Sequence, residues 1–69
     1  MTEEELKGYL LLLGLKEIHE KKKPYKWIMS NDEIHVIAHD RNYEISMAGM
    51  IICTGDEYEI FKTIQEVLK

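Results

Sequence analysis

The sequence predicts an α+β domain of the order α-β-β-β-(β)-α, in which an antiparallel meander sheet carries two helices packed on one face. Two observations predict this fold. Apolar residues recur at helical spacing near both ends of the chain, whereas apolar and polar residues alternate between them. The alternating stretches are short and separated by turn residues, which favours antiparallel neighbours. At 69 residues, the chain is expected to be a single domain, 1–69.

The opening helix is expected over residues 3–13. Thr2 and Glu5 have the spacing of a capping box, in which each side chain accepts a hydrogen bond from the other residue's backbone N–H. Gly14 is typical of the position just beyond a helix C-terminus. The apolar stripe of this helix consists of Leu6, Tyr9, Leu10 and Leu13.

The sheet is predicted from alternating stretches. Three of them are residues 25–30, 34–39 and 43–46. Met50 to Cys53 is expected to be a short buried continuation or a fourth strand. Leu15 to Glu20 fits either a short strand or an extension of the first helix. Turns are expected at Asn31-Asp32 and Asp40-Arg41-Asn42, and a loop at Lys21-Lys22-Lys23-Pro24.

The closing helix is expected over residues 56–68, with Thr54 and Glu57 as a second capping pair. Its apolar positions fall on one arc of about 120° on a helical wheel. They are Ile60, Phe61, Ile64, Val67 and Leu68. This pattern predicts an amphipathic helix that packs against the sheet.

The small size of the chain predicts association. Below about 70–80 residues, one core rarely supplies more than about 3–5 kcal/mol of stability. Cys53 is the single cysteine, so an internal disulfide and a cysteine-based zinc site are both excluded. We therefore expect a homodimer or a complex with a larger protein.

The first helix is the expected contact surface. Leu11 and Leu12 lie to either side of its stripe, and Leu15 would lie opposite if the helix continued. Gly8 would allow a close backbone approach. The alternative is a helix covered more deeply by the rest of the chain. The predicted interface residues are Leu11, Leu12, Leu15 and Tyr58.

Charge provides the alternative hypothesis, a small RNA- or DNA-binding protein. The net charge of −4 is unevenly spread, because residues 15–30 hold five lysines against two glutamates. Interleaved cations and aromatics are typical of nucleic-acid contacts. The residues concerned are Lys21, Lys22, Lys23, Lys26 and Trp27.

No catalytic motif, metal site or cofactor site is predicted, so the expected class is non-enzymatic. On a strand, His35 and His39 would lie about 13 Å apart, at about 3.3 Å per residue, which is too far to share one metal ion. An enzyme using either histidine with Cys53 or Asp40 is the remaining option. The longest apolar run is Tyr9–Leu13, far short of a membrane span, and the opening is acidic. The expected location is the cytoplasm.

In its brevity, its richness in Lys, Ile and Glu and its lack of motifs, the chain resembles small phage and prophage proteins of low-GC Gram-positive bacteria. Many of those proteins bind and inhibit a host enzyme or defence complex. The resemblance covers the whole length but transfers no residue. It implies a protein-interaction module, plausible as a phage-encoded inhibitor that acts by binding.

Overall fold

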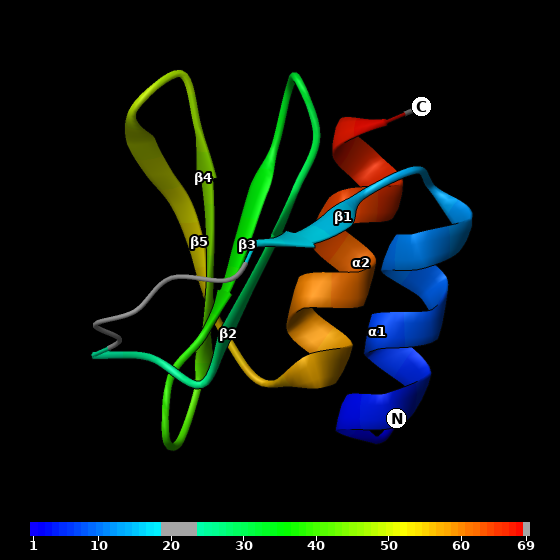
Figure 1. The fold of residues 1–69 in the computed structure, drawn as a ribbon, viewed down its shortest axis with the longest axis vertical. Coiled ribbons are helices and arrows are strands. Elements are labelled where there is room, and N and C mark those ends of the chain that lie inside the picture. The colour runs from blue at the N-terminus through cyan, green and yellow to red at the C-terminus, as the bar shows by residue number, and fades with distance from the viewer. Residues whose placement is uncertain (19–23, 69) are drawn as a thin grey trace.

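The computed structural model describes residues 1–18 and 24–68 and confirms the α+β class. The five strands form one antiparallel sheet in which each strand lies beside the next along the chain. Both helices lie on the same side of this sheet (Figure 1). The elements are α1 (Glu3–Leu12), β1 (Lys16–Ile18), β2 (Trp27–Ser30), β3 (His35–Ala38), β4 (Tyr43–Met47), β5 (Met50–Gly55) and α2 (Glu57–Val67). The predicted loop at residues 21–23 lies outside the described residues.

One core lies between the sheet and the helices. Alternation along the central strands turns one set of side chains toward the helices and leaves the other set on the open face. The helices bury Leu6, Leu10, Ile60 and Ile64 of the positions that helical spacing predicts. Val67 and Leu68, which the same spacing placed on the packing face of the closing helix, are exposed. The fully or nearly buried residues are Leu6, Leu10, Leu15, Trp27, Met29, Ile34, Val36, Ala38, Tyr43, Ile45, Ile60 and Ile64.

The two helix starts use the same chemistry, but one of them begins later than expected. In α1 the capping box is confirmed, with Glu5 N donating to Thr2 Oγ1 at 3.1 Å and Thr2 N donating to Glu5 Oε1 at 2.9 Å. The prediction of Thr54 as the second cap is wrong. Asp56 is the N-cap, and Glu59 N donates to its Oδ1 at 2.9 Å. Thr54 is still paired with Glu44 in the sheet, so the helix cannot begin there.

The segment after α1 is a strand, which settles the alternative left open by the sequence. Gly14 has a φ of +91°, a conformation that L side chains rarely adopt, and it ends the helix. The chain then pairs with β2, Lys16 opposite Ser30 and Ile18 opposite Ile28. β1 therefore adds a fifth strand at one edge of the sheet.

The opposite edge is β5, which a tight hairpin joins to β4. Its two turn residues both have positive φ, +51° at Ala48 and +79° at Gly49, as a two-residue type I′ turn requires. The expectation that Met50 to Cys53 is buried is wrong for the first three of these residues, all of which are exposed. The sequence shows that the run is apolar, but not that it lies at an edge with a neighbour on one side only.

Candidate functional site

The outward face of α1 carries two large apolar side chains. Leu11 is 59% exposed and Leu12 is 87% exposed. Gly8 lies one turn earlier on the same side of the helix, because residues three and four apart are neighbours on a helix surface. Gly8 is also exposed, and a Cβ placed on it would meet no atom within 4 Å. The packing of this protein therefore gives no reason for a glycine there.

Two further residues were predicted for this surface, and the structure separates them. Leu15 is 1% exposed and belongs to the core, so its assignment to an interface is wrong. The turn at Gly14 directs the chain back toward the sheet, and Leu15 N donates to Leu10 O at 3.1 Å. Tyr58 is 56% exposed on α2. This exposure is compatible with an interface, and the role of Tyr58 as an interface residue stays a prediction.

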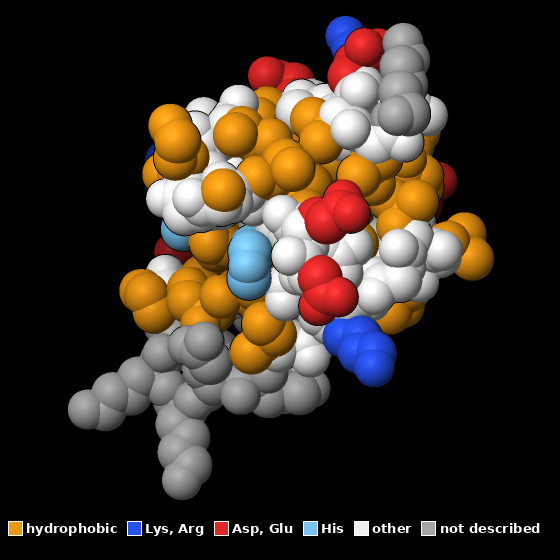
Figure 2. All heavy atoms as spheres, turned by 90° about the horizontal axis from the view of Figure 1, so that it is seen from above, with side chains coloured by type: hydrophobic (Ala, Val, Ile, Leu, Met, Phe, Trp, Pro, Cys, Tyr) orange, Lys and Arg blue, Asp and Glu red, His pale blue; other side chains and the backbone are white. Residues whose placement is uncertain are grey.

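The helical layer is held together beneath this surface and carries negative charge around it. The rings of Tyr9 and Phe61 meet edge to face, with centroids 4.7 Å apart. Glu3, Glu4 and Glu5 form the first turn of α1, and its last turn contains no basic residue. Figure 2 shows hydrophobic side chains spread over the end of the molecule where both helices finish, with acidic side chains among them.

The predicted nucleic-acid contact does not form a surface among the described residues. Trp27 is 5% exposed and packs its ring near Tyr43, with centroids 5.8 Å apart, so its proposed role in base stacking is wrong. Alternation along β2 places this side chain in the core. Lys26 Nζ donates to Glu3 Oε1 at 2.7 Å. The other three candidates, residues 21–23, lie outside the described residues.

Glu3 joins the start of α1 to the sheet. Its Oε1 accepts from Lys26 Nζ and, at 3.3 Å, from the Tyr43 hydroxyl. The hydrogen bond from Lys26 is the main reason why the pKa of Glu3 lies below its ordinary value, and the pKa of Lys26 is raised in return. Burial, followed by the nearby Glu57 carboxylate, raises the pKa of Tyr43. Each of these pKa shifts is caused by contacts within the fold, which indicates that Glu3 anchors the start of α1 to the sheet.

The histidines and the cysteine do not form a reaction centre among the described residues. His39 Nε2 lies 3.3 Å from Glu44 Oε1, and His35 is exposed on the open face of the sheet. Cys53 Sγ lies 3.2 Å from Thr63 Oγ1, where it joins β5 to α2. Within residues 1–18 and 24–68, no group of three or more potential ligands is placed to hold a metal ion.

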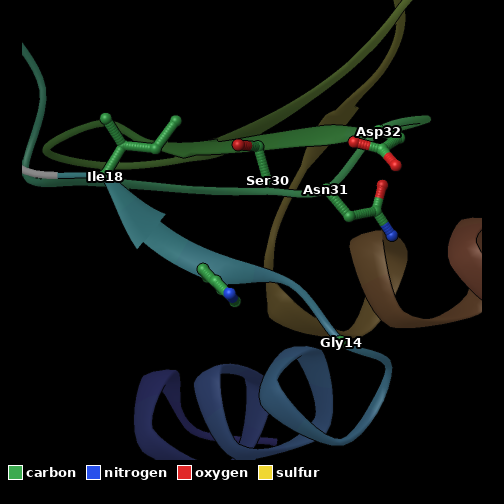
Figure 3. Close-up of a pocket in the computed structure, with 6 residues that line it drawn as sticks. Gly14, Ile18, Ser30, Asn31 and Asp32 are labelled. Carbon is green, nitrogen blue, oxygen red and sulfur yellow. The ribbon is translucent and has the colours of Figure 1, made fainter.

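A pocket of about 450 Å³ opens beside β1 (Figure 3). It is lined by Gly14, Lys16, Ile18, Ser30, Asn31 and Asp32. Asn31 has a structural role, because its Oδ1 accepts from the backbone N–H groups of Glu33 at 2.8 Å and Ile34 at 2.9 Å. This confirms the turn predicted at Asn31-Asp32. Among the described residues, the lining contains no histidine or cysteine, and its polar side chains are those of Lys16, Ser30, Asn31 and Asp32.

No described helix is both long enough and apolar enough to cross a membrane. Comparisons with protein-family models, with curated proteins and with solved structures found no match for this chain. The fold and the exposed side chains therefore define it only as a small α+β domain with an apolar helical surface.

Proposed function

We propose that this chain is a non-enzymatic protein-interaction module whose partner contacts the outward face of α1. The observation that carries the proposal is the exposed glycine beside exposed leucines. A glycine inside a helix costs about 0.5–1 kcal/mol relative to alanine. At Gly8 no neighbour within the protein offsets this cost. A partner backbone lying close to the helix would account for it.

The surface suggests the chemistry of that partner. Leu11 and Leu12 offer apolar contacts one turn after the glycine, and acidic side chains precede all three residues at the start of the helix. The matching partner is an apolar helix that crosses α1 at Gly8 and carries Lys or Arg on the side near the α1 N-terminus. Such charges would steer association and fix its orientation.

Binding of this kind suits an inhibitor, which needs only to occupy a surface of its target. The proposed inhibitor of a host protein or defence complex, acting in the cytoplasm, follows from the resemblance to phage proteins and depends on finding the target. Nucleic-acid binding is not favoured as a second function, because Trp27 is buried and Lys26 Nζ is bonded to Glu3 Oε1.

The experiment is quantitative capture from a bacterial lysate with three immobilised proteins: wild type, Leu12→Glu and Gln65→Glu. Gln65 is exposed on α2, so the control adds the same charge but removes no apolar surface from α1. We expect one protein to be recovered by wild type and by Gln65→Glu, and to be lost with Leu12→Glu.

Titration calorimetry with that purified protein completes the test. Loss of an interface hot spot costs about 2 kcal/mol or more, so Leu12→Glu should raise the Kd roughly 30-fold or more. If every captured protein binds the wild type and Leu12→Glu equally, α1 is not the contact surface and the proposal is wrong.

A further inference from the structure

The two edges of the sheet are built differently. Within the described residues, β1 has three residues, two of which are charged, and Glu17 Oε1 lies 2.7 Å from Lys7 Nζ. β5 has six residues, Met50-Ile51-Ile52-Cys53-Thr54-Gly55, and none is charged. Proteins commonly protect edge strands with charges, prolines or short length. β1 shows two of these protections, charge and short length. β5 shows none of the three, although a β-bulge interrupts its pairing opposite Ile45–Ser46.

β5 also exposes apolar side chains along this edge. Met50 is 70% exposed, Ile51 is 61% exposed and Ile52 is 42% exposed. Among the described residues, β5 pairs with β4 alone. The backbone groups on its other side are thus available to another strand, as in strand addition at a sheet edge.

We propose that β5 pairs antiparallel with β5 of a second copy, so that two five-stranded sheets become one continuous sheet. Charge restricts where a second copy can bind. Each chain has a net charge of −4, so most self-contacts would bring like charges together. Pairing β5 with β5 places only uncharged residues opposite one another in the two strands.

A stable dimer also requires a sufficient buried area. A standard interface buries about 800 Å² per partner, about a sixth of the 4776 Å² surface of this protein. A strand edge contributes only part of that area. α2 lies over β5, where Thr63 contacts Cys53, so pairing the strands also brings the two α2 helices to neighbouring positions. This surface is distinct from the α1 face, and the inference is independent of the proposed function.

The test is sedimentation velocity of the wild type, Ile51→Lys and Leu12→Lys from micromolar to millimolar protein. Both changes place a lysine at a highly exposed position, one on β5 and the other on α1. We expect a concentration-dependent dimer for the wild type and for Leu12→Lys. A two-fold interface contains each substitution twice. If each lysine weakens binding tenfold, Ile51→Lys raises the Kd about a hundredfold.

Two further measurements make the result decisive. Higher salt should strengthen the wild-type dimer, because screening weakens repulsion between two acidic bodies. Amide exchange in β5 of the wild type should slow as the protein concentration rises, a readout that requires no variant to fold. Ile51→Thr, which keeps a strand-forming residue, replaces Ile51→Lys if the lysine variant is unfolded, and should weaken the dimer less.

Three results would overturn the proposal. One is a wild-type monomer at every concentration, which would leave the edge to a strand from a different protein. Another is a dimer that Leu12→Lys dissociates and Ile51→Lys does not. The last is a dimer in which exchange of the β5 amides is independent of concentration.

Discussion

Replacing Gly8 by alanine tests separately the stability of the free protein and its affinity for a partner. The new Cβ meets no atom within 4 Å, so no repacking opposes it. Alanine in a helix interior is about 0.5–1 kcal/mol better than glycine. We therefore expect Gly8→Ala to stabilise the isolated protein by about that amount. For a domain of this size, this corresponds to a rise in Tm of about 2–8 °C.

Urea unfolding followed by circular dichroism measures this difference, with an unchanged slope showing that both proteins unfold alike. Gly14→Ala is the matched control. A Cβ at Gly14 also has open space around it, but this residue has a φ of +91°. The left-handed conformation costs an L residue about 1–2 kcal/mol, so the same substitution should there be destabilising.

The binding experiment should show the opposite effect at Gly8. If a partner helix lies close to this residue, the added methyl group weakens the complex while it strengthens the free protein. A less stable Gly8→Ala protein at low concentration would show that the α1 surface is already packed in the free protein, and would refute the reasoning. Unchanged affinity for the partner would remove the close approach from the proposal.

Three other predictions concern the core, the second cap and pH. Leu15→Ala should lower the free energy of unfolding, measured in urea, by about 2–5 kcal/mol. Leu12→Ala should change the free energy of unfolding by no more than about 0.5 kcal/mol. Equal losses in the two variants would contradict the burial of Leu15. Asp56→Ala should cost about 0.5–2 kcal/mol through loss of the N-cap, and Thr54→Ala should leave the cap intact; the reverse order would restore Thr54 as the cap. The pKa of Glu3 is lower in the folded protein than its ordinary value of 4.5. The ionised Glu3 therefore stabilises the folded state above pH 4.5, and this stabilisation is lost as the pH falls through the lowered pKa. Unfolding measured from pH 7 downward should therefore show a smaller acid-induced loss in Glu3→Gln, and identical pH profiles would exclude this contribution.

Local patterns predicted most of the fold because each depends on neighbours along the chain. Helical spacing located Leu6 and Leu10 in the core, and the alternating stretch 25–30 contains Trp27 and Met29, which the structure buries. The composition of the surrounding segment suggested that Trp27 contacts nucleic acid, but its position on the inward face of β2 buries it. Position in the strand decides burial, whereas composition does not.

Long-range pairing explains what the sequence analysis missed. The apolar run at Met50 to Ile52 was expected to be buried, but β5 is the last strand of the meander and has one neighbour. An uncharged apolar run fits a buried strand as well as an edge strand, so no local signal distinguished the two. Leu15 was assigned to the surface because an extended helix would place it there, and the turn at Gly14 prevents that extension.

In the proposed dimer, the unequal edges of the sheet would also determine where growth stops. A protein with two similar adhesive strands could add copies at both ends without limit, as fibres do. Here Lys16 and Glu17 make β1 a poor template for another strand. If two β5 strands pair across a two-fold axis as proposed, β1, with two charges in its three described residues, would form each end of the sheet, and the assembly would close at two chains.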